Sequence, residues 1–302
     1  MDMCTNKTAL SFNNYTNCKQ EIAYSVEGCL LPLSAGTWVS STRGTWTVSD
    51  DGTFSTISNF KADLSRSLTT ATLDCKSSSG TQYILGTRFE IFFAVFIDVY
   101  TCLDIRTTAV SPNSYVYYIV TPPDSNTGEQ FTSDISSACT NSNFETAINT
   151  HIVLQSGSET AAGVNYPDAI LGNYSVEYSD IDGNTVTGSD MDSCDNKTLM
   201  VFNNADSNTS LAFTSGNNLL ALHYVTSGSS VYVHTYNTDP TVSNPTTYSI
   251  ACWVIVSSSS QVKATVYPNE CVQGQSSTSV PYGGQKFVLT PQCEYMYYSL
   301  SH

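Results

Sequence analysis

The sequence is strongly acidic, although it carries few charged residues. Its 302 residues include 26 Asp and Glu against 11 Lys and Arg, so the formal net charge is −15, yet charged residues make up only 12% of the chain. A surface of this sign repels phosphate backbones and anionic headgroups, so we expect neither a nucleic acid nor a membrane as partner. The length predicts one large domain or two.

Ten cysteines indicate an oxidising compartment. Their number is even, and none of them forms a Cys-x-x-Cys pair, which excludes zinc ribbons and thioredoxin-like redox motifs. We therefore expect structural disulfides in a secreted, extracellular protein. The cysteines are Cys4, Cys18, Cys29, Cys75, Cys102, Cys139, Cys194, Cys252, Cys271 and Cys293.

The first residues, Met-Asp-Met-Cys, lack the basic and apolar regions of a signal peptide, so we expect that such a peptide has been removed or replaced by a start Met. No run of about 18 apolar residues predicts a membrane span. Several sequons permit N-glycosylation. Their number is about what chance produces in a chain this rich in Asn, Ser and Thr, so they do not argue for it. They lie at Asn6, Asn14, Asn173, Asn196 and Asn208.

Strand signals separated by turn residues fill the first part of the chain. Gly36-Thr-Trp38 opens a strand-like stretch in the way that lipocalin-like barrels begin, and it equally fits an aromatic residue after a turn glycine in any β-sandwich. Phe89–Val99 is a continuous apolar stretch, too aromatic and β-branched for a typical helix, and it predicts a strand buried on both faces. Tyr115–Val120 predicts another strand. The loop at 121–128 is rich in turn residues, and we place the domain boundary there.

The second part repeats this character. Gly172-Asn-Tyr174 is a second Gly-x-aromatic opening, Leu219–Val225 and Val231–Tyr236 predict a hairpin, and Ile250–Val256 predicts a further strand. Helical periodicity is weak throughout. The predicted fold is therefore all-β, with two domains that are β-barrels or β-sandwiches and are stapled by disulfides. A lipocalin-like barrel is one of the possible forms. The N-terminal domain is expected at 1–122 and the C-terminal domain at 123–302.

An internal repeat indicates a duplicated unit. Residues 4–14 match residues 194–204, with seven of eleven positions identical, and the match continues for a short distance after one gap. Cys4 is kept in the second copy as Cys194, whereas Cys18 and Cys29 have no cysteine counterparts. The two copies need not be whole domains.

The repeat predicts one disulfide. Partners of a disulfide should appear or vanish together, because a cysteine that loses its partner is prone to mispairing, so we expect a bond between Cys18 and Cys29. Neighbouring strand signals predict two more bonds, Cys75–Cys102 and Cys252–Cys271. The sequence leaves the pairing of four residues open: Cys4, Cys139, Cys194 and Cys293.

His223 and His234 lie on the two arms of the predicted hairpin. A four-residue loop at 227–230 places them opposite each other on one face, whereas a five-residue loop sends them to opposite faces. They are the candidate catalytic residues, as an imidazole pair for acid–base chemistry, and the alternative is two ordinary half-exposed strand histidines. No carboxylate in the hairpin completes a set of metal ligands, so no metal site is predicted there.

Two acidic features admit alternative interpretations. The segment 180–195 is dense in carboxylates, which suggests Ca²⁺, but Gly183 comes too early for an EF-hand and Met191 stands where the bidentate Glu belongs, so a solvated acidic loop is the other interpretation. Asp98, inside the apolar stretch, is either a buried carboxylate with a raised pKa or the mark of a bend between two strands.

Several short phrases resemble a secreted family of annelid and mollusc proteins whose domains have no assigned function. They span most of the chain, and the family supplies no catalytic residues to carry over. The phrases are Gly36-Thr-Trp38, Ser41-Thr-Arg-Gly44, Tyr100-Thr-Cys-Leu103, Ser114-Tyr-Val-Tyr-Tyr118, Cys194-Asp-Asn-Lys-Thr198, Tyr236-Asn-Thr-Asp239, Ala251-Cys-Trp-Val254 and Tyr267-Pro-Asn-Glu-Cys271.

In size and secreted character, the chain also resembles the luciferases of bioluminescent syllid fireworms. This resemblance implies an oxidoreductase that oxidises a small-molecule luciferin with O₂ as co-substrate and emits light. No nucleotide or flavin motif is present, so no such cofactor is expected. The alternative is a non-enzymatic extracellular protein that binds a ligand in a calycin-like manner or belongs to a matrix. A deep apolar cavity holding a histidine favours the enzyme, and a solid core favours the matrix protein.

Overall fold

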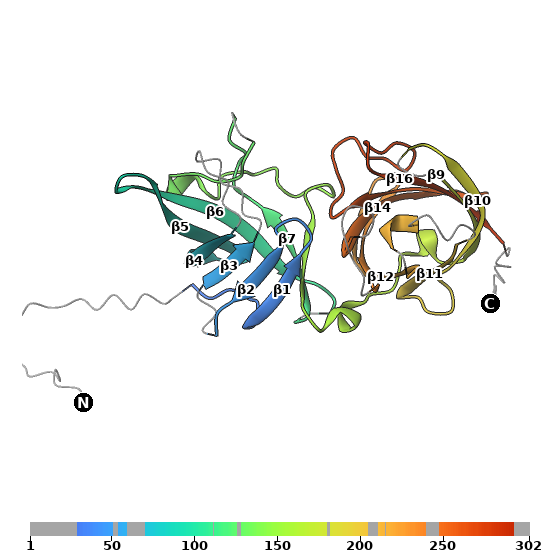
Figure 1. Ribbon diagram of the computed structural model, residues 1–302, viewed down its shortest axis with the longest axis horizontal. Coiled ribbons are helices and arrows are strands. Elements are labelled where there is room, and N and C mark those ends of the chain that lie inside the picture. The colour runs from blue at the N-terminus through green and yellow to red at the C-terminus, as the bar shows by residue number, and fades with distance from the viewer. Residues whose placement is uncertain are drawn as a thin grey trace, which may run out of the picture.

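The computed structural model describes residues 29–50, 54–58, 70–110, 112–125, 128–179, 182–204, 211–214, 216–239 and 248–292. In these ranges the chain is all-β, as predicted. Sixteen strands form two antiparallel sheets, and each sheet closes into an eight-stranded barrel. Figure 1 shows the two barrels side by side. No helix in the described ranges has the length and apolar character of a membrane span.

The first barrel follows the chain order, and it closes where its first strand pairs with its last. Its strands are β1 (Gly36–Ser40), β2 (Thr45–Val48), β3 (Phe54–Ser58), β4 (Thr70–Ser79), β5 (Gln82–Phe92), β6 (Val95–Thr107), β7 (Ser114–Ile119) and β8 (His151–Gln155).

The second barrel has the same up-and-down order and closes between its own first and last strands. Its strands are β9 (Asn173–Ser179), β10 (Thr185–Asp192), β11 (Leu199–Asn203), β12 (Asn218–Ser227), β13 (Ser230–Asn237), β14 (Ile250–Ser257), β15 (Val262–Pro268) and β16 (Gln285–Pro291). The helical segments of the described chain are short 3₁₀ turns: η1 (Ile135–Ser137), η2 (Glu159–Ala162), η3 (Asp168–Ile170) and η4 (Leu211–Phe213).

The Gly-x-aromatic phrases stand at equivalent places in the two barrels. Trp38 lies in β1 and Tyr174 in β9, the first strand of each barrel, and both rings are buried in the core of their own barrel. Each ring also closes a short turn before its strand. The Trp38 indole Nε1 donates to the Ser34 carbonyl at 2.9 Å, and the Tyr174 hydroxyl donates to the Leu171 carbonyl at 3.1 Å. Both phrases thus open the first strand of a closed barrel and place an aromatic ring in its core.

Side chains fill the described interior of the second barrel. Trp253 lies at its centre, with its ring centroid 4.9 Å from that of Phe287 and 6.3 Å from that of Phe202. Tyr178 stacks on Phe287 at 5.9 Å. These four large rings are all buried and come from four different strands, so the barrel is a packed core.

The two barrels are joined by a further apolar cluster on their outer faces. Val116 and Tyr118 of β7 pack there with Leu220 and Leu222 of β12 and with Ile250 of β14. All six residues of β7 are therefore buried, because one face lines the first barrel and the other contacts the second. A strand that is buried on both faces loses the polar alternation of a surface strand.

The division of the chain lies later than predicted. The expected boundary at 122/123 would assign β8 to the C-terminal domain. Instead, β8 pairs with β1 and β7 and closes the first barrel, and the second barrel begins at β9. The turn-rich loop at 121–128 is part of the long connection between β7 and β8. Turn residues mark the loop but say nothing about which sheet the next strand joins.

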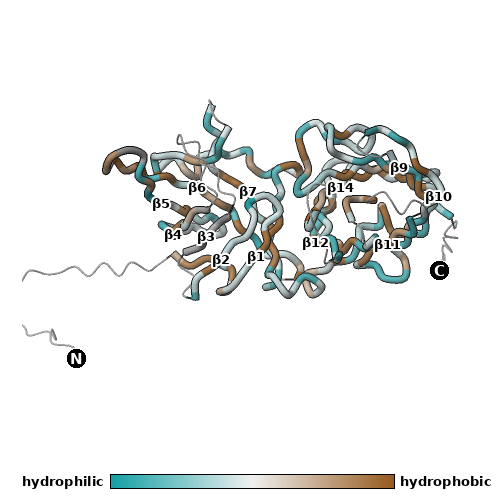
Figure 2. The backbone as a smooth tube through the Cα atoms, in the orientation of Figure 1, coloured by the Kyte–Doolittle hydropathy of each residue, from teal (hydrophilic) through white to brown (hydrophobic). Residues whose placement is uncertain are grey.

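The apolar stretch Phe89–Val99 is not one buried strand, and that prediction is wrong. The chain reverses at Phe93 and Ala94, so the stretch forms the tip of the β5–β6 hairpin. This tip projects from the first barrel and is coloured as hydrophobic in Figure 2. The misreading has a physical cause, because apolar residues occupy even the two turn positions and no polar residue marks the reversal.

Three disulfides link described cysteines: Cys29–Cys75, Cys102–Cys139 and Cys252–Cys271. The predicted Cys252–Cys271 bond is confirmed. The predicted bonds Cys18–Cys29 and Cys75–Cys102 are wrong, because Cys29 and Cys75 bond each other. The repeat covers too little of the chain to include Cys75, so it could not reveal the true partner of Cys29. Cys18 lies outside the described residues, as do Cys4 and Cys293.

Candidate functional site at the junction of the barrels

The predicted hairpin exists, and it places His223 and His234 opposite each other. β12 and β13 pair as far as Ser227 and Ser230, so the loop is shorter than the predicted 227–230. His223 faces His234, as the four-residue-loop alternative predicted. Cross-strand partners point to the same face of a sheet. His234 is on the outer face of the second barrel, since its neighbours Val233 and Thr235 are on the other face and Val233 belongs to the barrel core.

His234 is not presented to a ligand. The ring is fully buried beneath the first barrel, with the main chain of Thr150 nearby, and no described residue makes a hydrogen bond of normal geometry to either ring nitrogen. Burial lowers its pKa to about 3, and the neighbouring His223 and His151 add to this effect. Burial also lowers the pKa of the half-buried His223. The buried imidazole of His234 is thus neutral and a weak base, which makes it a poor general base.

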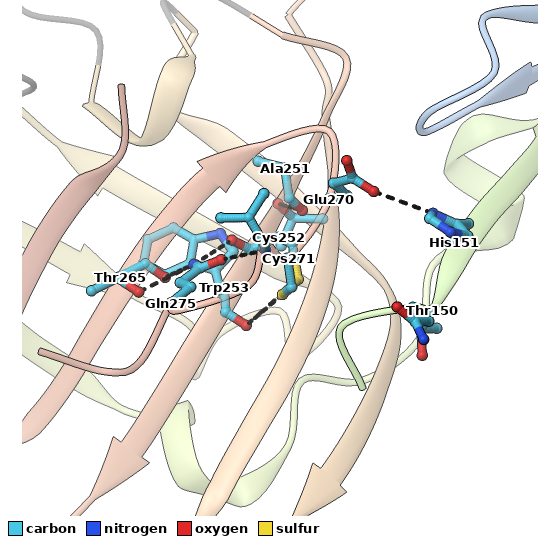
Figure 3. The surroundings of a disulfide bond; sticks show 12 residues. Thr150, His151, Ala251, Cys252, Trp253, Thr265, Glu270, Cys271 and Gln275 are labelled. Atoms are coloured by element: carbon cyan, nitrogen blue, oxygen red, sulfur yellow. Dashed lines mark hydrogen bonds and ion pairs between the residues drawn. A yellow bond between two sulfur atoms is a disulfide. The ribbon is translucent and has the colours of Figure 1, made fainter. Parts of the chain in front are cut away.

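A third histidine, which the sequence did not single out, lies on the other side of the junction. His151 is the first residue of β8, and its ring stacks on Tyr117 with centroids 5.1 Å apart. Its Nδ1 is 3.3 Å from the Thr42 hydroxyl and 3.6 Å from a carboxylate oxygen of Glu270. Glu270 belongs to the second barrel, so the pair joins the two barrels, as Figure 3 shows.

The loop after β15 holds Glu270 in place. Asn269 adopts a positive φ of 66°, where Asn is tolerated better than most residues, and its N–H donates to the Ile250 carbonyl at 2.8 Å. The next residue after Glu270 is Cys271, which is bonded to Cys252 of β14. Further along the loop, the Gln275 amide donates to the Thr265 hydroxyl at 3.1 Å. The carboxylate is therefore presented from a tied loop at the end of a strand.

The charges around this pair have a definite pattern. Burial raises the pKa of Glu270, and the positive charge of Arg43 opposes that rise. Burial lowers the pKa of His151 to about 3, and the same Arg43 lowers it further. His151 is thus neutral at physiological pH and can act as a hydrogen-bond donor or acceptor. Glu270 is the stronger base of the two.

A chain of hydroxyl groups continues from His151 into the first barrel. The Tyr117 hydroxyl lies 2.7 Å from the hydroxyl of Ser40 and 2.9 Å from that of Thr42. The Arg43 N–H donates to the Ser40 hydroxyl at 3.0 Å, which closes the turn between β1 and β2. Burial raises the pKa of Tyr117, so its hydroxyl keeps its proton. The hydroxyl chain fixes the position of Thr42 beside His151.

Two cavities flank this cluster. One, of about 200 Å³, is lined by His151 and Glu270 together with residues of both barrels. The other, of about 300 Å³, lies between the β1–β2 turn and the residues around Ile250, and its walls include Ser40 and Thr42. Each cavity has walls from both barrels, as is common for sites at domain interfaces. We define the junction site as Thr42, Tyr117, His151 and Glu270 with the smaller cavity.

The remaining predicted positions lie elsewhere. Asp98 is neither fully buried nor at a bend: it is partly exposed on β6 and accepts two hydrogen bonds from Arg88, which lowers its pKa. Asp192 is engaged in a local turn, where it accepts from the Cys194 N–H at 2.6 Å. Within the described ranges, no group of three acidic, histidine or cysteine residues is placed to hold a metal ion.

Of the sequons, Asn196 is exposed and Asn173 is half-buried at the start of β9. The other three, Asn6, Asn14 and Asn208, lie outside the described residues, as does His302.

The sequence held only a faint signal for the junction site. Glu270 lies within the phrase Tyr267-Pro-Asn-Glu-Cys271, where a turn residue and a cysteine bracket it. Nothing local distinguishes His151, because its importance comes from contacts with residues more than a hundred positions away. Comparison with family models, curated proteins and solved structures finds no match to this chain. Fold and site together define a tandem of two up-and-down β-barrels with a polar site at their junction.

Proposed function

We propose that the chain is an oxygen-dependent luciferase whose reaction takes place at the junction site. The resemblance to secreted annelid proteins and to syllid luciferases supports the reaction class. The observation that carries the choice of site is the pairing of Glu270, whose pKa is raised, with a neutral His151 at the wall of a cavity. O₂ chemistry without a nucleotide or flavin needs such a site, because the substrate must first become an anion that can reduce O₂.

The proposed roles follow from the charges. The Glu270 carboxylate takes a proton from an acidic O–H or C–H group of the luciferin, and the resulting anion gives its electrons to O₂. His151, neutral, donates a hydrogen bond to the substrate anion, and the positive charge of Arg43 near both groups stabilises that anion. His223 and His234 have no direct part in this scheme.

The packed barrels limit the non-enzymatic alternative. A calycin-like carrier holds its ligand inside the barrel, and Trp253 with its neighbouring rings fills the described interior of the second barrel. A solid core is what a matrix protein would show. The cavity that contains a histidine is instead between the barrels and is of mixed polarity. Whether the protein is an enzyme or a ligand-binding protein, we therefore expect its small ligand to bind at the junction.

The test is light emission. Purified protein mixed with crude luminous mucus extract of a syllid should emit light only when O₂ is present. Replacing Glu270→Gln should lower the initial light intensity by about 100-fold or more, the usual scale for loss of a general base. Glu177→Gln, which changes an exposed carboxylate on β9, is the matched control and should leave the intensity unchanged.

Two results would contradict the proposal in different ways. No light from the unchanged protein with any syllid extract would retire the luciferase assignment itself. Full light from Glu270→Gln would leave the reaction class standing and place the base elsewhere. The pH profile adds a third check: since burial raises the pKa of Glu270, activity should fall on acidification at a pH above the ordinary carboxyl value of 4.5.

A further inference from the structure

The tip of the β5–β6 hairpin is an exposed apolar surface. Phe93 is 83% exposed, Phe96 55% and Val95 52%. Figure 1 shows this hairpin projecting at the end of the molecule away from the second barrel. Single exposed apolar residues are ordinary, but neighbouring ones on a projecting turn indicate a contact surface.

The backbone of the tip shows that these side chains are held there against local preference. Phe93 and Ala94 have φ values of 34° and 64°, in the left-handed region. A two-residue hairpin turn of this kind favours Asn-Gly or Asp-Gly, and a bulky residue with positive φ is strained. The Glu90 carboxylate accepts from the Ala94 N–H at 2.9 Å, which supports the turn. Phe93 thus keeps a largely exposed side chain in a backbone conformation that disfavours a bulky residue.

The apolar side chains of the tip do not share one face. Neighbouring residues of a strand point to opposite sides of a sheet, so Val95 and Phe96 are exposed on opposite faces of the hairpin. A protein partner that packed on the sheet would cover one face. A medium that surrounds the tip covers both. Behind the tip, Arg88 binds both carboxylate oxygens of Asp98 at 2.7 and 2.8 Å. Nearer the turn, the exposed Glu90 lies opposite Phe96.

We propose that this hairpin tip inserts shallowly into an uncharged lipid surface, that is, one made of zwitterionic headgroups. Aromatic and aliphatic side chains bind the boundary between headgroups and acyl chains, while the Glu90 carboxylate and the Arg88–Asp98 pair stay at the headgroup level, so the insertion is shallow. The net charge of −15 excludes an anionic surface, because it would be repelled. The proposal departs from the expectation of no membrane partner, which rested on charge alone. It is independent of the proposed enzymatic function.

The test is co-sedimentation of the full chain with vesicles of pure phosphatidylcholine. The unchanged protein should bind, and replacing part of the zwitterionic lipid with phosphatidylserine should weaken binding. The double change Phe93→Ser and Phe96→Ser should reduce the partition constant on the order of 100-fold, because the loss of each phenylalanine ring should lower that constant about tenfold. Tyr282→Ser is the control, because Tyr282 is also 83% exposed but lies on the second barrel, and it should have no effect.

A second variant separates binding from folding. Phe93→Asn with Ala94→Gly gives the turn its preferred residues, so the protein should be at least as stable as the unchanged chain, yet it should bind vesicles about tenfold less. Absence of vesicle binding by the unchanged protein overturns the proposal, as does equal binding by the Phe93→Ser and Phe96→Ser protein. Concentration-dependent dimerisation that the double change abolishes, without any vesicle binding, would show that the tip contacts protein and would also overturn it.

Discussion

The buried histidines at the junction should make the protein sensitive to mild acid. In the folded chain, His151 and His234 each have a pKa lowered from 6.5 to about 3, largely by burial. The unfolded chain therefore binds protons below pH 6.5 that the folded chain does not bind, so the free energy of unfolding falls as the pH drops from 6.5 towards 3. Above pH 6.5 both states are neutral at these sites, and the effect vanishes.

The magnitude follows from the distance to the ordinary pKa. At about pH 5, each histidine in the unfolded state is about 1.5 pH units below its pKa, which corresponds to about 2 kcal/mol per residue and about 4 kcal/mol for the two. His223 acts in the same direction. Glu270 acts in the opposite direction, because its raised pKa lets the folded state take up a proton before the unfolded state does.

The assay is urea unfolding at about pH 7.5 and about pH 5, followed by tryptophan fluorescence. Trp38 and Trp46 report on the first barrel and Trp253 on the second. The unchanged protein should lose about 4 kcal/mol between the two pH values, and His234→Gln should lose only about 2 kcal/mol, whatever its stability at the higher pH. If His234→Gln loses as much as the unchanged protein, the imidazole of His234 titrates normally and is not buried as described.

Two further predictions concern the second barrel. The double change Cys252→Ser and Cys271→Ser removes a disulfide whose cysteines are 19 residues apart. In thermal unfolding, the free energy of unfolding should fall by about 3 kcal/mol. Light emission should fall as well, because Glu270 loses its anchored neighbour. A loss of stability with unchanged light would mean that the loop holds Glu270 without the disulfide. Trp253→Ala removes the central ring of the barrel core and should cost about 3 to 5 kcal/mol in urea unfolding, and a cost under about 1 kcal/mol would contradict the packed interior.

Much of the fold could be predicted because local patterns determine it. Turn residues between β-branched and aromatic runs predicted the strands, and the Gly-x-aromatic phrases at Trp38 and Tyr174 marked the first strand of each barrel. Strand parity reduced the arrangement of His223 and His234 to two alternatives, and the structure shows the one in which they face each other. Where a pattern had two physical causes, the sequence could not decide. The run at Phe89–Val99 would look the same in a buried strand and in an exposed apolar tip.

The junction site could not be predicted for a different reason. Thr42, His151 and Glu270 come from three distant segments. Closure of the first barrel by β1 and β8 brings Thr42 beside His151, and the packing of the second barrel on the first adds Glu270. The disulfide Cys29–Cys75 was hidden in a similar way, since Cys29 precedes β1 and Cys75 lies in β4, 46 residues further along the chain. Sequence reasoning from one chain sees local periodicity, and contacts between domains leave no periodic trace.

The architecture itself explains why a site would lie at this junction. A closed barrel has no free edge strand to bind another chain, and an interior filled by rings such as Trp253 and Phe287 has no room for a ligand. Two such barrels side by side create one new environment, the contact between their outer faces, where polar groups can be buried without disturbing either core. Glu270 and His151 lie in that contact, and burial there is what shifts both of their pKa values. The pair of His151 and Glu270 therefore exists only where the two barrels meet.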